Sequence, residues 1–140
     1  MSLLGNFDIA GSALSAQTVR LNTVASNLAN AETVSGSAED TYRARMPQFE
    51  TIFNDAMTGS GDSASMGVQV RQVLESEAAP RQQYQPEHPM ADEQGYIWLP
   101  NVNAVEEMAN MISASRSYQS NVEVMNTSKQ LLMRVLSLGQ

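Results

Sequence analysis

The sequence predicts a mainly α-helical protein in which long N- and C-terminal helices pair antiparallel, in a coiled-coil-like way, around a small β-containing central insert. Apolar residues repeat at helical spacing through residues 7–30 and again through residues 103–139, which gives each helix one apolar face. The chain between them holds all five prolines and several short β-prone runs. We therefore divide the chain into a helix in 1–33, an insert in 34–100 and a helix in 101–140.

The N-terminal helix is predicted from a heptad pattern. Two lines of residues form its apolar face, with Gln17 as a polar exception: Phe7, Leu14, Leu21 and Leu28, and Ala10, Val24 and Ala31. Gly11 and Ser12 weaken the start of this helix. Asn27 and Asn30 lie near its predicted end, and we assign them to the helix terminus.

The insert is predicted to begin with a loop in residues 34–41 and to contain a short helix after Pro47. The glycine- and serine-rich stretch 58–65 is predicted to be a disordered tip. A half-buried strand is expected after Gly67, where Val68, Val70 and Leu74 occur among polar residues.

The second half of the insert is expected to add two more short strands. Residues 81–84 are predicted to pair with the strand that follows Gly67. Residues 96–99 form a β-prone run after a turn at Asp92 to Gly95. An insert of three such strands is too small to fold alone.

The C-terminal helix is predicted to be about 50 Å long at 1.5 Å per residue. Asn103 caps its first turn, with Glu106 three residues later as in a capping box, and Glu107 is assigned to the solvent-facing side. Gly139 suits the left-handed position after the last turn. The predicted apolar stripe consists of Met108, Met111, Ser115, Tyr118, Val122, Met125, Lys129, Leu132 and Leu136.

Composition and charge exclude several functions. The net charge is −7 and the eight basic residues are scattered, which argues against nucleic-acid binding and against an anionic membrane surface. No apolar run approaches the roughly 20 residues that span a bilayer, so we expect no direct membrane insertion. The first eight residues lack the basic and apolar regions of a secretory signal peptide.

No residues with catalytic or metal-binding spacing stand out. The chain has no Cys and one His, and His88 between Glu87 and Pro89 is expected to lie in an exposed turn rather than in a metal site. Adjacent carboxylates such as Glu106 and Glu107 point apart on a helix. We therefore predict no enzyme activity, no catalytic residue, no bound metal and no cofactor.

The residues also resemble a known family. Residues 101–108, 111–118 and 121–127 are similar to the C-terminal signature of proximal-rod protein C of the bacterial flagellar basal body, and residues 21–33 resemble a motif shared by flagellar rod and hook proteins. Residues 42–43 and 84–96 also fit. The match weakens at 34–41, where the family tends to have a glycine-rich turn and this chain has Ser-Gly-Ser-Ala-Glu-Asp.

This resemblance implies a structural subunit of the flagellar proximal rod, exported by the flagellar type III apparatus without a cleaved signal and located in the periplasmic basal body. It implies an oligomeric rod, with other rod proteins and the membrane-ring-to-rod adaptor as partners. The alternative from the residues is a secreted helical adaptor or chaperone-like module. The residues predicted to pack between subunits are Phe7, Leu14, Leu21, Val24, Leu28, Met108, Met111, Tyr118, Val122, Met125, Leu132 and Leu136.

Overall fold

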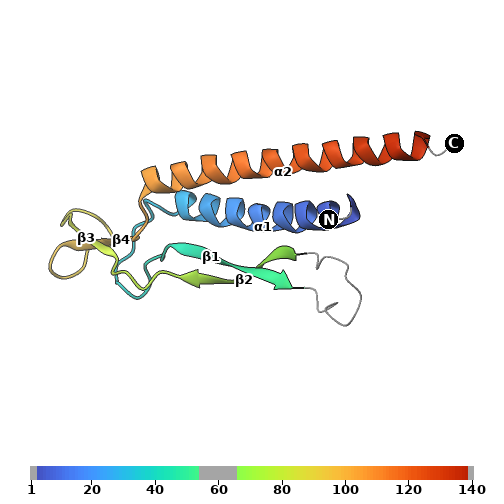
Figure 1. The fold of residues 1–140 in the computed structure, drawn as a ribbon. Helices are drawn as coiled ribbons and strands as arrows, with labels where there is room; N and C mark the ends of the chain where they lie inside the picture. Colours follow the sequence, from blue (N-terminus) through green and yellow to red (C-terminus); the bar gives the residue numbers. More distant parts are fainter. Residues whose placement is uncertain (1–2, 54–65, 139–140) are drawn as a thin grey trace.

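Two antiparallel helices dominate the computed structural model, which describes residues 3–53 and 66–138. Helix α1 (Leu3–Ala29) lies beside the longer α2 (Ala104–Leu138), and the hairpin of β1 (Arg45–Phe53) and β2 (Met66–Glu75) covers another side of α1 (Figure 1). The mainly α fold, the antiparallel helices and the β-containing insert are thereby confirmed. The coiled-coil character of the pair stays a prediction.

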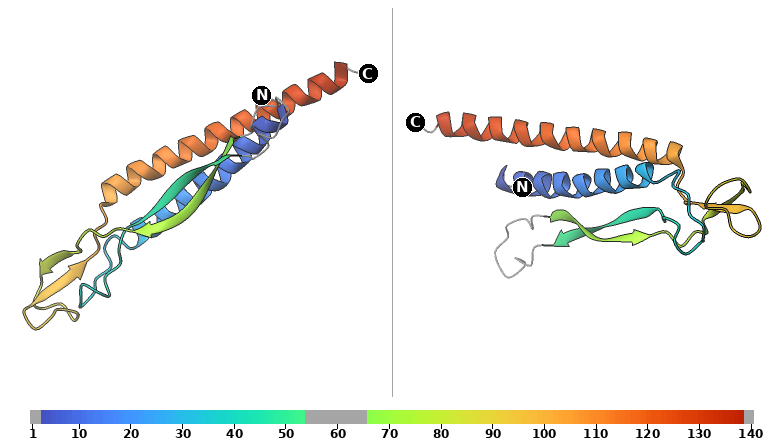
Figure 2. Two further views of the ribbon diagram at one scale, coloured as in Figure 1. Left: turned by 60° about the horizontal axis from the view of Figure 1, so that its bottom comes forward. Right: turned by 180° about the vertical axis from the view of Figure 1, so that it is seen from behind.

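A second small sheet lies at the end of the molecule where α1 stops and α2 begins (Figure 2). Strand β3 (Arg81–Tyr84) pairs antiparallel with β4 (Tyr96–Leu99). The insert therefore has four strands in two separate sheets within its described part, where the sequence predicts three. The predicted disordered tip at 58–65 lies outside the described residues.

Helix α1 continues through both residues that were expected to weaken it. The Ser12 hydroxyl donates to the carbonyl of Ile9 at 2.9 Å. At Gly11, an added Cβ would lie 4.0 Å from the Cε of Met125. Gly11 therefore faces α2, and an added methyl group there would make only ordinary van der Waals contact.

The predicted helix after Pro47 is wrong, because residues 45–53 form strand β1. Pro47 is compatible with this strand because of where its nitrogen points. The backbone N–H and carbonyl of Arg45 form hydrogen bonds with the Asn27 side chain and therefore point away from β2. Backbone groups two residues apart point the same way in a strand. The nitrogen of Pro47 therefore lies at the outer edge, where the missing N–H removes no ladder bond.

Strand β2 confirms the strand predicted around residues 68–74, but its predicted pairing with 81–84 is wrong. It pairs with β1 instead, from Arg45 opposite Glu75 to Phe53 opposite Met66, with a register shift at Gln48 and Phe49. Residues 81–84 pair with the run at 96–99.

The β3–β4 sheet is closed by a turn that requires glycine. Gly95 has a φ of 81°, a conformation that side chains disfavour. The Asp92 carboxylate fixes the turn by accepting hydrogen bonds from the backbone N–H groups of Gln94 and Tyr96 at 2.9 and 2.8 Å. Ser35 pairs with Trp98 at the other side of β4, and this contact ties the loop after α1 to the small sheet.

Candidate assembly interface

Helix α1 is the central layer, and its buried residues are small. Its fully covered side chains face α2 or the β1–β2 hairpin: Ala10, Ala16, Thr23, Val24 and Asn27. The predicted heptad residues Phe7, Leu14, Leu21 and Leu28 are half-buried, and Ala31 just after the helix is buried. The N-terminal part of the predicted packing set thus contributes to the interior of the single chain.

The contact between the helices, which we call the α1–α2 seam, differs from the predicted stripe on α2 by one residue. The deepest residues of α2 are Ala114 and Ser128, at 0% and 5% exposed. They belong to a line spaced by seven with the half-buried Glu107 and Asn121. The sequence places residues 108, 115, 122 and 129 on this line instead.

The shift has a physical reason in side-chain size. The predicted pattern places the larger apolar residues of α2 against α1. In the structure alanine and serine occupy these positions, because small side chains let two helix backbones approach more closely. Met111, Met125 and Leu132, which are common to both patterns, are half-buried. Val122 is half-buried at the flank of the seam.

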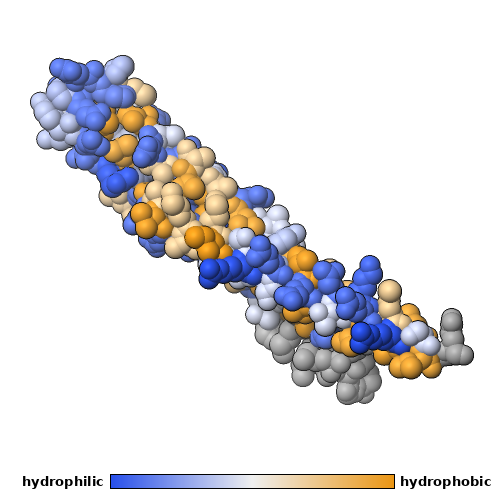
Figure 3. Space-filling view, turned by 90° about the horizontal axis from the view of Figure 1, so that it is seen from above, coloured by the Kyte–Doolittle hydropathy of each residue, from blue (hydrophilic) through white to orange (hydrophobic). Residues whose placement is uncertain are grey.

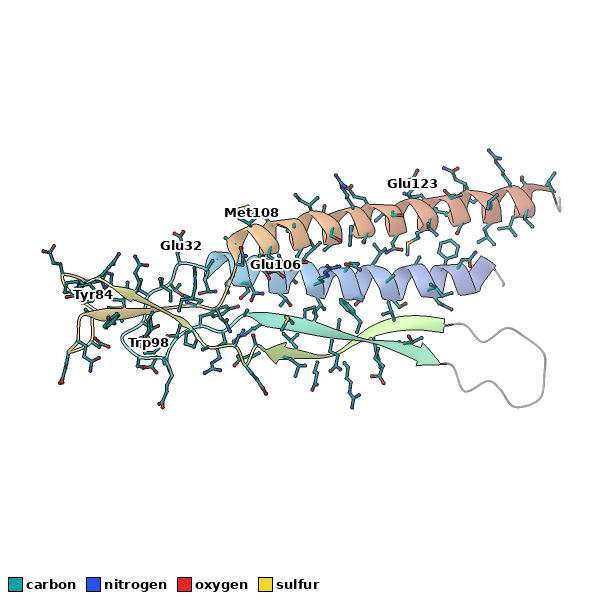
Figure 4. The ribbon with its side chains drawn as sticks, turned by 60° about the vertical axis from the view of Figure 1, so that its left-hand side comes forward. Glu32, Tyr84, Trp98, Glu106, Met108 and Glu123 are labelled. Carbon is teal, nitrogen blue, oxygen red and sulfur yellow. The ribbon has the colours of Figure 1, made fainter. Side chains whose placement is uncertain are left out.

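Three residues of the predicted packing set stay exposed in the single chain. Met108, Tyr118 and Leu136 are 51%, 37% and 64% exposed. Met108 points away from α1 (Figure 4). Any packing role of these three therefore requires another molecule.

Asn27 lies in the last turn of α1, as the sequence predicted, and it is also the point where three elements meet. Its side-chain amide donates to the carbonyl of Arg45 at 2.8 Å and to the carboxylate of Glu107 at 3.2 Å. Its side-chain oxygen accepts from the Tyr42 hydroxyl and from the Arg45 N–H, both at 2.9 Å. These four bonds use the full capacity of a buried amide, and we call this cluster the Asn27 junction.

The Asn27 junction also corrects the assignment of Glu107. This residue is half-buried and accepts a hydrogen bond from α1, so it does not belong to the solvent-facing side of α2. Glu106 is the exposed member of the pair.

The predicted end residues Asn30 and Asn103 do occupy helix ends. The Asn30 amide donates to the Ser26 carbonyl at 2.8 Å and so satisfies a carbonyl of the last turn of α1. The Asn103 side chain accepts from the N–H groups of Val105 and Glu106 at 3.1 and 3.4 Å, which is an N-cap.

The outer side of α2 carries many uncovered apolar side chains. Figure 3 looks onto this side of the molecule and shows apolar areas separated by hydrophilic ones. The exposed large apolar residues of α2 are Val105, Met108, Ile112, Tyr118, Val124, Leu131, Met133, Val135, Leu136 and Leu138. A helix with apolar residues on both its covered and uncovered sides is typical of one that packs against further molecules.

Charge is distributed unevenly between the helices and the rest of the chain. The two helices together contain four acidic and four basic residues: Asp8, Glu106, Glu107 and Glu123, and Arg20, Arg116, Lys129 and Arg134. The net charge of −7 therefore arises entirely outside α1 and α2. Helices without net charge can pack in many copies with little repulsion.

No chemical site competes with this surface in the described part of the chain. His88 accepts a hydrogen bond from the N–H of Met90 at 3.1 Å and so stabilises a turn. Residues 3–53 and 66–138 hold no group of His, Asp or Glu side chains that could bind a metal. Neither described helix is long and apolar enough to cross a membrane.

Two sequence families match the chain at its helices. The family described as Flagella basal body rod protein matches residues 7–36, and the family described as Flagellar basal body rod FlgEFG protein C-terminal matches residues 93–138. These segments contain most of α1 and all of α2.

Curated relatives match the chain along its whole length. The flagellar basal-body rod protein FlgC of Salmonella typhimurium is 51% identical over 140 residues, and that of Yersinia enterocolitica is 50% identical over 140 residues. FlgC of Bacillus subtilis is 35% identical over 151 aligned residues. Each match covers 100% of both chains.

The paired terminal helices and the two family matches define the class of protein, a flagellar basal-body rod protein. Within this class, the chain belongs to the flagellar basal-body rod protein FlgC family.

Proposed function

We propose that this chain is a structural subunit of the flagellar proximal rod and that the outer side of α2 is its main surface for packing against neighbouring subunits. One observation carries the proposal. Helix α2 is covered by α1 along one side only, and it exposes large apolar residues along most of its 35-residue length. Such a surface is costly in a free monomer and is stabilised when another helix covers it.

The mechanism that we propose is mechanical. Close-packed side chains cannot slide past one another without opening voids, so a wall of interlocked helices resists torsion and carries torque from the motor to the hook. The single chain already uses Val24, Met125 and Leu132 in its interior or at its seam. Met108, Tyr118 and Leu136 remain available for neighbours.

The family membership supports further proposals on partners and location. We propose that other rod proteins and the membrane-ring-to-rod adaptor contact this subunit in the periplasmic part of the basal body. The insert, which holds the net negative charge, would then lie away from the helix-packed wall. Export through the flagellar type III apparatus without a cleaved signal fits the same proposal.

The experiment places an acidic residue on the exposed side of α2. Val124→Asp and Tyr118→Asp replace side chains that are 48% and 37% exposed, so the monomer should fold. A carboxylate trapped in a packed interface costs several kcal/mol, so we expect loss of rods and of swimming when either variant is the only copy in a motile bacterium. Gln119→Asp, at an exposed polar position of the same helix, is the matched control.

Three measurements separate assembly from folding and export: circular dichroism of the purified variants, their amount in the periplasm, and electron microscopy of isolated basal bodies. Wild-type swimming with complete rods in both α2 variants would refute the proposed surface. A stable variant that reaches the periplasm but forms no rods would support it, whereas a secreted adaptor would leave the rod intact.

A further inference from the structure

Helix α2 extends beyond α1 at one end of the molecule. α2 has 35 residues and α1 has 27, and in both views of Figure 2 the C-terminal end of α2 projects past the start of α1. We define residues 131–138 as the overhang. Most of its large apolar side chains are exposed to solvent: Leu131, Met133, Val135, Leu136 and Leu138 are 46%, 59%, 57%, 64% and 86% exposed.

A second apolar surface lies at the opposite end of the same helix. Val105, Met108 and Ile112 are 76%, 51% and 56% exposed. Because they are spaced by three and four residues, they form one line on α2, and we call it the start patch. The start patch and the overhang each extend over about two helical turns, or roughly 12 Å.

The two surfaces carry opposite charges. The exposed Arg134 lies in the overhang and the exposed Lys129 lies just before it, whereas the exposed Glu106 lies beside the start patch. Glu32 lies at the same end of the molecule as Glu106 (Figure 4). In residues 3–53 and 66–138 the single ion pair joins Arg45 to Glu75, so these four charges have no partner of opposite sign within the described chain.

The helix dipole accounts for part of this arrangement. Acidic residues in the first turn and basic residues near the last turn stabilise an isolated helix. The dipole gives no reason for large apolar residues to be exposed beside these charges. A contact between molecules accounts for both features.

We propose that the overhang of one copy lies along the start patch of a second copy, head to tail, with Lys129 and Arg134 facing Glu106 and Glu32. This inference rests on the proposed rod function and names the neighbour that covers the two ends of α2. The two surfaces differ from each other, so the contact is heterologous. Repetition of a heterologous contact gives a ring or a helical array, and each copy in its interior has both ends covered.

The test uses the absence of cysteine from the sequence. The double variant Met108→Cys with Leu136→Cys is supplied as the only copy in a motile bacterium, and isolated basal bodies are treated with a short thiol-reactive cross-linker. We expect covalent dimers and higher multimers of this chain, at least tenfold more than with the control pair Gln119→Cys and Leu136→Cys. Gln119 is an exposed polar residue of α2 that lies outside both the start patch and the overhang.

A charge reversal tests the direction of the contact. Arg134→Glu added to the double variant should lower the cross-linked fraction several-fold, and Glu106→Arg in the same chain should restore it. A non-specific hydrophobic contact between the helix ends would not be restored by the second charge reversal.

Each outcome decides the proposal. Rods that contain the chain without cross-links would overturn it and leave the proposed rod function intact, as would cross-links to a different rod protein only. Rods that lack the chain would overturn both. If the first cysteine pair prevents rod formation, Ile112→Cys with Leu138→Cys makes the same measurement one turn away on the start patch.

Discussion

Replacement of Ala114 by Leu tests the packing of the α1–α2 seam. Ala114 is 0% exposed and is one of the two buried residues of α2, so three added carbon atoms find no open space. Overpacking of this kind costs about 1–3 kcal/mol. A protein of this size loses roughly 3–5 °C of melting temperature per kcal/mol. We therefore expect a fall of roughly 3–15 °C.

Thermal unfolding followed by far-UV circular dichroism measures this change. Ala109→Leu makes the same substitution at an exposed position of α2, and we expect its stability to change by less than about 0.5 kcal/mol. Ser115→Leu distinguishes the two candidate seams, because it would fill the interior only if residue 115 lay on the line that faces α1. A wild-type melting temperature for Ala114→Leu, together with a higher one for Ser115→Leu, would refute the observed seam.

Two further substitutions test local structure. Asn27→Asp removes the two hydrogen bonds that the Asn27 amide donates and brings a second carboxylate next to Glu107. We expect a loss of at least about 2 kcal/mol in chemical denaturation, against almost none for Asn22→Asp at an exposed position of α1; equal losses would contradict the junction. Gly95→Ala would place a Cβ 2.9 Å from the Cε2 of Tyr84 at a positive φ. Hydrogen exchange in β4 should accelerate about tenfold for a cost near 1.4 kcal/mol, and Gly36→Ala, which has ordinary φ, should not reproduce it.

The long helices could be predicted from the sequence because their signal is redundant. Many residues report the same period, so a few exceptions such as Gln17 do not change the result. The Asn103 cap was predictable for a similar reason, since asparagine before an apolar repeat has a specific local role. These features depend on residues close together in the chain.

The exact face of α2 could not be predicted, because it depends on the surface of α1. The seam uses Ala114 and Ser128, whose small size matters only once the partner helix is in place. Residues on either neighbouring line of a helix satisfy the same three-and-four spacing. Helical spacing alone therefore cannot distinguish a line from the one beside it.

The Asn27 junction was missed although the sequence holds a signal for it. Asn27 lies three residues after Val24 and four before Ala31, so it belongs to the buried side of α1 and not only to its end. A polar residue on a buried line must have hydrogen-bond partners. Its partners Arg45 and Glu107 are 18 and 80 residues away in the chain, and no local pattern identifies them.

The separation of charge between helices and insert bears directly on assembly. A net charge of −7 spread evenly over the chain would place about half of it on α1 and α2, where neighbouring helices approach to within roughly 10 Å. At that distance physiological salt, with a screening length of about 8 Å, removes only part of the repulsion. With the charge confined to the remainder of the chain, the helices can pack at close range. The like charges of neighbouring inserts then favour arrangements that hold the inserts apart, which orients the helices toward one another.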